Sequence, residues 1–199
     1  MIIDLKRCIG CDACTLACKA EQGTPPNIQF ARISRTVYGK YPDVQGFFLP
    51  VLCNHCENPA CKKACPSHAI SQTKEGLVLV NDEKCVGARA CVAACPYHQA
   101  FFPDDDRKYF GQYLTKFEEY HQTRRKSSTA IKCTFCSHNL AENKEPACVR
   151  ICPTECRLFG DLDDPNSNPN QYLKKRSPEA EPVPLRPEAG TKPKVLYLL

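Results

Sequence analysis

Four closely spaced cysteines near the start of the chain carry the first chemical signal. They follow the pattern C-x2-C-x2-C-x3-C and are Cys8, Cys11, Cys14 and Cys18. Cysteine runs with this spacing hold iron–sulfur clusters: the first three thiolates bind one cluster, and the fourth points away toward a second. The motif therefore predicts partner motifs elsewhere in the chain.

Three further cysteine motifs meet that expectation. The second contains Cys53, Cys56, Cys61 and Cys65, and the fourth contains Cys133, Cys136, Cys148 and Cys152. The third has only Cys85, Cys91 and Cys95, because alanine stands at position 88, where the spacing places a cysteine. A proline follows the last cysteine of these three motifs, and its fixed φ turns the chain away from the cluster. These prolines are Pro66, Pro96 and Pro153.

The composition favours metal ligation over other uses of cysteine. The chain has 199 residues, 17 prolines and no tryptophan, so its apolar core is modest for its length. Disulfides are the alternative explanation of sixteen cysteines, but disulfide frameworks do not repeat one tight unit, and the start MIIDLKRC shows no secretory signal. No apolar stretch approaches the ~20 residues of a membrane span. The net charge of +5 does not predict nucleic-acid binding, because four clusters with their thiolates would add roughly −8.

Short strands and helices are expected around the motifs. We predict strands at 1–5, 46–52 and 100–102, a helix at 12–20, and a hairpin of residues 69–71 and 77–80. Residues 21–45 read as a loop with one strand near 33–38, because glycine and proline interrupt them. Residues 103–131, with the charged runs 104–106 and 124–126, read as a solvated insertion carrying an amphipathic helix near 108–122. A docking surface is the alternative there.

Each motif with its flanking elements resembles half of a bacterial two-cluster ferredoxin. This resemblance implies an α+β fold of two pseudo-symmetric ferredoxin-like halves with long loops and an extended C-terminal tail. The outer half would comprise residues 1–52 with 132–160, and the inner half residues 53–102. Residues 103–131 are then an insertion. The tail, 161–199, is too polar to form a core alone, so we expect it to bind a partner or to be disordered.

In ferredoxins of this kind, three cysteines of one motif and the fourth cysteine of the other bind each cluster. Pairing the first motif with the fourth, and the second with the third, gives four ligand sets. The first set is Cys8, Cys11, Cys14 and Cys152; the second is Cys18, Cys133, Cys136 and Cys148; the third is Cys53, Cys56, Cys61 and Cys95; the fourth is Cys65, Cys85 and Cys91.

Alanine at position 88 cannot bind iron, so the fourth set is one ligand short. We predict three [4Fe–4S] clusters in the first three sets and one [3Fe–4S] cluster in the fourth. A [4Fe–4S] cluster with water or hydroxide on the free iron, or an empty site, are the alternatives. Loss of an iron and a thiolate usually raises the reduction potential.

The remaining candidate ligands are interpreted as surroundings of the clusters. Cys156 lies outside the four sets, and we interpret it as a buried small residue. Four histidines lie near motif cysteines and could suggest a Rieske or zinc site, but the cysteines already fill nearly every ligand position. These histidines are His55, His68, His98 and His138.

Several longer motifs are similar to one known family. They are CNHCENPAC, KEGLVLV, KCTFC, ACVRICPTECRLFGDLDDPNS and RPEAGTKPKVLYL. With these segments the chain resembles the iron–sulfur electron-transfer (beta) subunits of the dimethyl sulfoxide reductase superfamily of molybdenum oxidoreductases. Polysulfide and thiosulfate reductase subunits look nearest, and arsenate and tetrathionate reductase subunits are similar too. Alanine at position 88 departs from the all-cysteine pattern of the sulfur-compound branch.

The resemblance implies a non-catalytic subunit that passes electrons through four clusters in one line. Its partners would be a molybdenum bis-pterin catalytic subunit, near the first set, and an integral-membrane, quinone-reactive anchor subunit, near the fourth. The chain itself would not span the membrane, and no catalytic residue is expected. The resemblance favours the periplasmic face, reached by export with a partner, over the cytoplasmic face.

Two other functions remain open from the sequence. A free-standing soluble polyferredoxin would use the same four motifs without a permanent partner. A structural zinc module would use C-x2-C pairs, but it would not require a fourth cysteine before proline.

Overall fold

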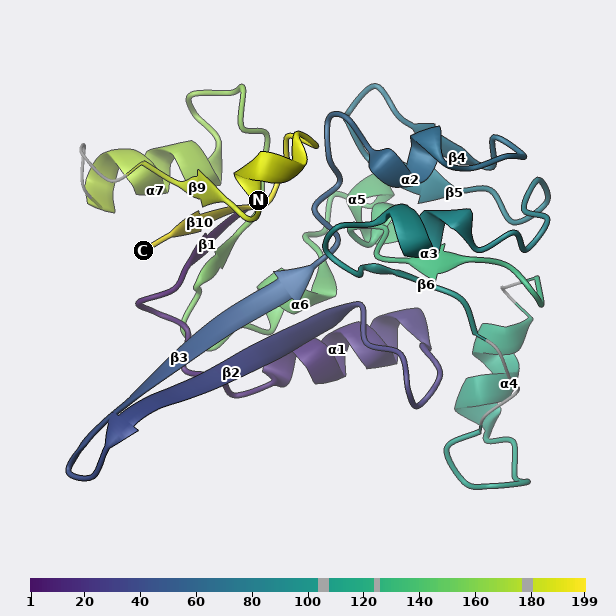
Figure 1. Ribbon diagram of the computed structural model, residues 1–199, viewed down its shortest axis with the longest axis horizontal. Coiled ribbons are helices and arrows are strands. Elements are labelled where there is room, and N and C mark those ends of the chain that lie inside the picture. Colours follow the sequence, from purple (N-terminus) through teal and green to yellow (C-terminus); the bar gives the residue numbers. More distant parts are fainter. Residues whose placement is uncertain (104–107, 124–125, 177–180) are drawn as a thin grey trace.

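The computed structural model describes residues 1–103, 108–123, 126–176 and 181–199, which form short helices and small sheets (Figure 1). The helices are α1 (Ala13–Gln22), α2 (Ala60–Lys63), α3 (Ala90–Ala94), α4 (Lys116–Gln122), α5 (Ser137–Ala141), α6 (Ala147–Arg150) and α7 (Asn168–Arg176). The strands are β1 (Ile2–Asp4), β2 (Ala31–Lys40), β3 (Asp43–Leu52), β4 (Ile70–Gln72), β5 (Val78–Val80), β6 (Ala100–Phe101), β7 (Ile131–Lys132), β8 (Arg157–Leu158), β9 (Val183–Pro184) and β10 (Leu196–Leu198). The expected mixture of helices and strands is confirmed, with each predicted strand within two or three residues of its expected place.

Strand pairing links the four cysteine motifs in cyclic order, so that they form a ring. The strand after each motif pairs antiparallel with the strand before the next one, which gives the pairs β2–β3, β4–β5 and β6–β7. The ring closes because β8, after the fourth motif, pairs antiparallel with β1, before the first. The cysteine loops are therefore all held at the ends of short paired strands.

Helix packing follows the same order of motifs. Helix α1 of the first motif packs against α6 of the fourth, and α2 of the second packs against α3 of the third. This is the pairing that the division into an outer half and an inner half requires. The exact division stays a prediction, because the halves also share a core in which Cys53 of the inner half packs with Cys18 and Cys133 of the outer half.

The strand expected near 33–38 is present as β2, whereas the expectation of a loop after it, up to residue 45, is wrong. Strands β2 and β3 form a ladder of ten residue pairs, from Ala31 opposite Leu52 to Lys40 opposite Asp43. Glycine and proline suggested a loop, but they sit at the turn: Gly39 has φ of +94°, where a Cβ would lie 2.1 Å from the carbonyl oxygen of Asp43. The resulting hairpin reaches away from the rest of the molecule (Figure 1).

The end of the tail also differs from the expectation. Strand β10 pairs in parallel with β1, and the order β8–β1–β10–β9 makes a four-stranded sheet. Val195 and Tyr197 are 0% and 1% exposed, so the apolar end of the chain packs into its own core instead of lying across a partner. Partner binding by the rest of the tail stays a prediction.

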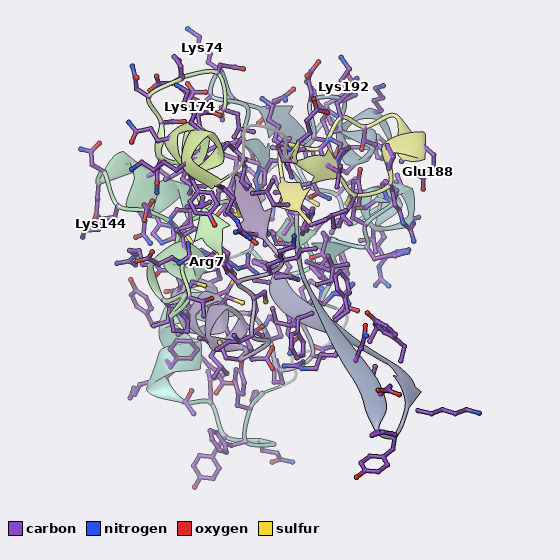
Figure 2. All side chains as sticks on the ribbon, turned by 90° about the vertical axis from the view of Figure 1, so that its left-hand side faces the viewer. Arg7, Lys74, Lys144, Lys174, Glu188 and Lys192 are labelled. Carbon is purple, nitrogen blue, oxygen red and sulfur yellow. The ribbon has the colours of Figure 1, made fainter. Side chains whose placement is uncertain are left out.

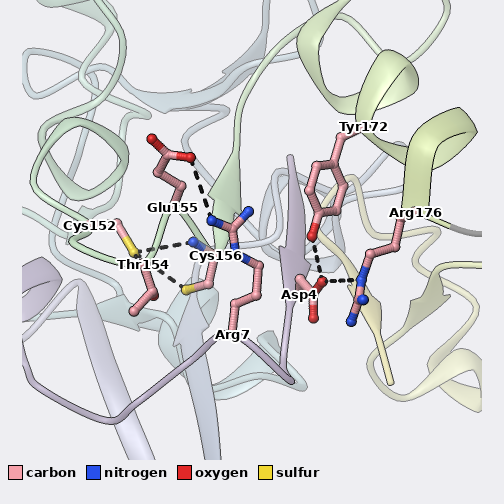
Figure 3. Close-up of polar contacts among 8 residues, drawn as sticks. All are labelled: Asp4, Arg7, Cys152, Thr154, Glu155, Cys156, Tyr172 and Arg176. Atoms are coloured by element: carbon pink, nitrogen blue, oxygen red, sulfur yellow. Dashed lines mark hydrogen bonds and ion pairs between the residues drawn. The ribbon is translucent and has the colours of Figure 1, made fainter.

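Helix α7 of the tail is tied to β1 by one buried carboxylate. Asp4 is 0% exposed and accepts hydrogen bonds from the Tyr172 hydroxyl at 2.6 Å and from Arg176 Nε at 2.8 Å (Figure 3). Burial raises the pKa of Asp4, but these two bonds and the Arg176 charge outweigh it and lower the pKa overall. Asp4 therefore fixes the first strand and the tail to each other.

The described part of the insertion contains a shorter helix than predicted. Helix α4 begins where Thr115 caps it: the Thr115 hydroxyl accepts from the Glu118 backbone, and the Glu118 carboxylate accepts from the Thr115 backbone. Such a capping box fixes a helix start, which excludes residues 108–114 from the helix. Residues 104–106 and Arg124-Arg125 of the predicted charged runs lie outside the described residues.

Lysine side chains reach solvent from several parts of the chain. Figure 2 shows Lys74, Lys144, Lys174 and Lys192 pointing outward from different segments. In the part of the chain that the structure describes, no helix has the length and apolar character needed to cross a membrane.

Candidate iron–sulfur sites

The first set lies around one cavity beneath the base of the hairpin. Cys8, Cys11, Cys14 and Cys152 all line it, together with Ile33 and Pro50 of β2 and β3. The cysteine loop is pressed onto the hairpin: a Cβ on Gly10, whose φ is +68°, would lie 2.5 Å from the Phe48 ring. Arg35 of β2 holds the same loop by pairing with Asp12 and by donating to the Gly10 carbonyl at 2.8 Å.

Cys156 lies in the same cavity wall as the first set. It is 3% exposed, and its Sγ lies 3.5 Å from Cys152 Sγ (Figure 3). Burial works to raise the pKa of Cys152, but donation from the Thr154 hydroxyl, the Cys156 backbone N–H and the Cys156 thiol lowers the pKa overall. These donors favour Cys152 as the thiolate and leave Cys156 as the buried thiol beside it.

The second set is the most deeply placed. All four of its cysteines are buried: Cys18, Cys133, Cys136 and Cys148. Burial, followed by the charges of Cys148 and Cys136, raises the pKa of Cys18 to about 12. Burial and the neighbouring Cys18 likewise raise the pKa of Cys133 well above its usual value. The four sulfurs are therefore electrostatic neighbours in an apolar environment.

The third set lines a second cavity. Cys53, Cys56, Cys61 and Cys95 surround it, and Thr191 of the tail forms part of its wall. The tail runs along this loop, because Glu57 and Asn58 donate their backbone N–H groups to the carbonyls of Lys192 and Thr191. Burial chiefly raises the pKa of Cys56 to about 11 and of Cys61 to about 12.

The fourth set is smaller and nearer the surface. Cys91 is buried, whereas Cys65 and Cys85 are half-buried. Burial and then the charges of Cys65 and Cys85 raise the pKa of Cys91, so the three sulfurs are neighbours. Ala88 is exposed, between Gly87 and Arg89, which both have positive φ.

Backbone N–H groups point at several of these sulfurs. Gln99 donates to Cys95 and Cys156 donates to Cys152, each at 3.4 Å, and Ala130 donates to Cys85 at 3.5 Å. The same turn follows each of the three Cys-Pro pairs. In it, the third residue after the cysteine has positive φ and donates its backbone N–H to the carbonyl oxygen of that cysteine. These residues are His68, His98 and Glu155.

The donors present fit iron–sulfur clusters. All sixteen cysteines are free thiols, and thiolates with backbone N–H donors are the ligands that such clusters use. Burial, and after it the repulsion between neighbouring thiolates, raises the pKa of Cys18, and bound iron would offset both effects. Among the described residues no three His, Cys, Asp or Glu side chains converge on a single metal ion. Two of the four sets instead surround cavities.

The histidines occupy other roles. His55 is 1% exposed, accepts the Val78 backbone N–H through Nδ1 at 3.0 Å, and stacks on Phe135. His138 Nε2 lies 2.6 Å from the Glu21 carboxylate. Both side chains are thus engaged with protein groups beside the cysteine loops.

Sequence reasoning missed two buried cations beside the sulfurs. Lys132 is 4% exposed and donates to the carbonyls of Val78 and Cys133. Arg157 is 2% exposed and donates from Nη2 to Cys14 Sγ at 3.4 Å. Lys132 directly precedes Cys133, and Arg157 directly follows Cys156. This adjacency to a cysteine is the sequence feature that could have indicated the two buried cations.

Comparison with known proteins shows the family of this chain. A family model described as a 4Fe-4S dicluster domain matches residues 44–111 and 117–162, which is more than half of the chain. This protein belongs to the iron–sulfur subunits of the dimethyl sulfoxide reductase superfamily of molybdenum oxidoreductases. It is accordingly an iron–sulfur protein of electron transport.

Three relatives illustrate the range of the family. The arsenate respiratory reductase iron–sulfur subunit ArrB of Shewanella sp. (strain ANA-3) is 38% identical and aligns with 100% of this chain and 94% of its own length. A tetrathionate reductase subunit of Salmonella typhimurium is 39% identical, with 100% and 71% covered. A subunit of the anaerobic dimethyl sulfoxide reductase of Escherichia coli is 33% identical, with 98% and 85% covered. The superfamily that the sequence resembles is confirmed, and the polysulfide or thiosulfate type stays a prediction.

Proposed function

We propose that this chain carries electrons through four iron–sulfur clusters between a molybdenum bis-pterin catalytic subunit and a quinone-linked membrane anchor. The ligands would be the four sets: three for [4Fe–4S] clusters and the fourth, which lacks a cysteine at position 88, for [3Fe–4S]. When bound, such clusters accept and release single electrons. The reaction served would be the anaerobic respiration of a sulfur compound or a similar oxyanion.

The observation that carries the proposal is that consecutive sets share structural elements. Helix α1 bears Cys14 of the first set and Cys18 of the second. The second and third sets meet where His55 stacks on Phe135, with ring centroids 3.9 Å apart. The third and fourth sets meet at α2 and α3, because Cys61 and Cys91 lie on these two packed helices. The sets therefore follow one another in the order first, second, third, fourth.

Exposure of the cysteines separates the second set from the others. The second set is wholly buried, whereas the first includes the exposed Cys11, and the third and the fourth each have two half-buried cysteines. Residues that reach solvent next to the two end sets include Ile9, 58% exposed, and Val86, 70% exposed. The ends of the series are thus the places where partners can approach closely enough to exchange electrons.

A catalytic role for this chain alone is not part of the proposal. The relatives are named as subunits of arsenate, tetrathionate and dimethyl sulfoxide reductases, which supports a subunit that needs a catalytic partner. Its place would be peripheral to the membrane through its partners, on the periplasmic face after export with one of them.

The test is isolation of the tagged chain from its own host under anaerobic growth, followed by metal analysis. We expect iron and acid-labile sulfide in near-equal amounts, and molybdenum in the same fraction because the catalytic subunit co-purifies. Size-exclusion chromatography with metal detection would show whether iron and molybdenum elute together.

Two outcomes would contradict the proposal in different ways. A chain that elutes alone, loaded with iron and without molybdenum, would support a free-standing polyferredoxin. A chain that contains zinc in place of iron would support a structural zinc module.

A further inference from the structure

Arg157 is a buried cation without an ordinary counter-ion. Its side chain comes from β8, is 2% exposed, and donates a hydrogen bond from Nη2 to Cys14 Sγ at 3.4 Å. Its Nη1 is buried and has no hydrogen-bond partner among the residues that the structure describes. Among the described residues no carboxylate lies within ion-pair distance of Arg157. An unpaired buried charge is strongly unfavourable, so other negative groups must compensate it.

The negative groups that face Arg157 are cysteine sulfurs of two different sets. Burial lowers the pKa of Arg157, but the charges of Cys148 and Cys14 outweigh that effect and raise its pKa overall. Cys14 belongs to the first set and Cys148 to the second. The geometry agrees: Nη2 of Arg157 donates to Cys14 Sγ, and β8, which bears Arg157, packs against α6, which bears Cys148.

The strand pairing explains this position. In β8, Leu158 is opposite Ile2 of β1, and these two side chains pack together with Leu198 in a small apolar cluster. Successive side chains of a strand point to opposite faces, so Arg157 is directed to the other face, toward α1 and its cysteines. The register of β8 therefore requires Arg157 to be buried. If the strand were turned over, Leu158 would leave its apolar cluster and face the cysteines instead.

We propose that Arg157 is a shared counter-ion of the first and second clusters and raises the reduction potentials of both. Reduction adds one negative charge to either cluster, and a guanidinium beside the ligands stabilises that charge. The interaction is weakly screened because the site is buried, and the guanidinium stays charged at all working pH values. Arg157 would also reduce the repulsion between electrons held on neighbouring clusters. The inference rests on the cluster assignment of the proposed function.

Arg150 provides a matched control. It is also an arginine near the second set, where its charge lowers the pKa of Cys136, although burial is the larger effect on that thiol and raises its pKa. Its side chain is 46% exposed, however, and lies 3.6 Å from the Glu21 carboxylate. Solvent and Glu21 should screen its charge, so its removal should have a small effect.

The experiment is an EPR-monitored redox titration of the iron-loaded chain, together with its co-purifying partners. In Arg157→Gln we expect the reduction potentials of the first and second clusters to fall. At a fixed applied potential, the reduced-to-oxidised ratio of each of these clusters should drop tenfold or more. That ratio corresponds to at least about 59 mV for a one-electron couple. The other two potentials should stay unchanged. Arg157→Lys should keep both potentials near those of the wild type, and Arg150→Gln should change any ratio by less than threefold.

Three results would overturn the inference. One is a full iron content in Arg157→Gln with all four potentials unchanged. Another is an equal shift of all four clusters, and the third is an Arg150→Gln effect as large as that of Arg157→Gln. A wild-type chain that holds no iron would instead contradict the proposed function.

If Arg157→Gln loses iron, Arg157→Lys shows whether the site needs the positive charge or the shape of arginine. If lysine restores both iron and potentials, the site requires the positive charge, as proposed. If lysine also loses iron, the site requires the shape of arginine, and the electrostatic inference is wrong.

Discussion

A single residue, Ala88, determines the composition expected of the fourth cluster. It stands on an exposed loop between two residues of positive φ, Gly87 at +72° and Arg89 at +56°. At Gly87 a Cβ would lie 3.2 Å from the Ser128 carbonyl oxygen, so the neighbouring backbone limits rearrangement of this loop. The methyl group of Ala88 supplies no ligand atom, and the set keeps three sulfurs.

Ala88→Cys should convert the fourth cluster from [3Fe–4S] to [4Fe–4S]. The wild type should give an oxidised [3Fe–4S] EPR signal near one spin per chain and contain about fifteen irons, and the variant should lose the signal and gain about one iron. Val86→Cys is the matched control, because it adds a cysteine to the same loop at a 70%-exposed position outside the ligand spacing. Persistence of the signal in Ala88→Cys, or its absence from the wild type at about sixteen irons, would contradict the assignment.

The cysteine motifs can be read from the sequence because their spacing is local, and their assignment to ligand sets stays a prediction. In the first motif the cysteines Cys8, Cys11 and Cys14 lie within seven residues, and the proline after the last cysteine of the other three motifs fixes the next turn. The buried cations were not accessible. Arg157 is buried because β8 pairs with β1, more than 150 residues away in sequence, and neither residue type nor spacing records that pairing. A charged residue in the segment ECRLF is ordinarily expected to face solvent.

At the scale of elements, the end of the tail connects the loop around Asn54 to β1. Residues 191–192 bond to the loop of the third set, Lys194 donates its backbone N–H to Asn54, and β10 then pairs with β1. The polar composition of 161–190 gave no indication that the tail packs against the rest of the chain, because this packing depends on a few buried residues at its end. The β2–β3 hairpin was concealed in a similar way by the glycine and proline of its turn.

Tyr197→Ala should destabilise the fold strongly. Tyr197 is 1% exposed and its hydroxyl donates to the Pro50 carbonyl at 2.9 Å, so it connects β10 to β3. Removing a buried large aromatic side chain costs about 3–5 kcal/mol, whereas Tyr197→Phe should cost about 1 kcal/mol for the lost hydrogen bond. The urea midpoint of the iron-loaded chain, followed anaerobically by circular dichroism, measures both.

Tyr41→Ala is the matched control for this prediction. Tyr41 is 93% exposed at the turn of the hairpin, and exposed substitutions usually change stability by less than about 0.5 kcal/mol. Equal midpoints for Tyr197→Ala and Tyr41→Ala would show that the packing of the tail does not stabilise the fold.

For the whole molecule, iron and apolar packing stabilise different regions. The main core combines Ile3, Phe30 and Leu52 with cysteines of three sets. The second core, around β4 and β5, has Ile70, Val78 and Ala130 as its buried apolar residues, and the rest of it is largely made of cysteines of the third and fourth sets. The sheet that contains the tail has an apolar cluster of its own without cysteine. The inner half should therefore depend on iron more than the outer half and the tail do.

Removal of iron should accordingly unfold the molecule unevenly. Binding free energy of a metal site that exists only in the folded chain is folding free energy, and the inner core has few other buried contacts. After anaerobic chelation we expect hydrogen exchange, measured by mass spectrometry, to lose protection first in β4, β5, α2 and α3, while the ten-pair ladder of β2 and β3 stays protected longer. Reconstitution with iron and sulfide should restore protection everywhere, which serves as the control for irreversible damage. Equal loss in both halves would mean that the ring of paired strands holds the molecule as one cooperative unit, and unchanged protection would mean that the fold does not depend on iron.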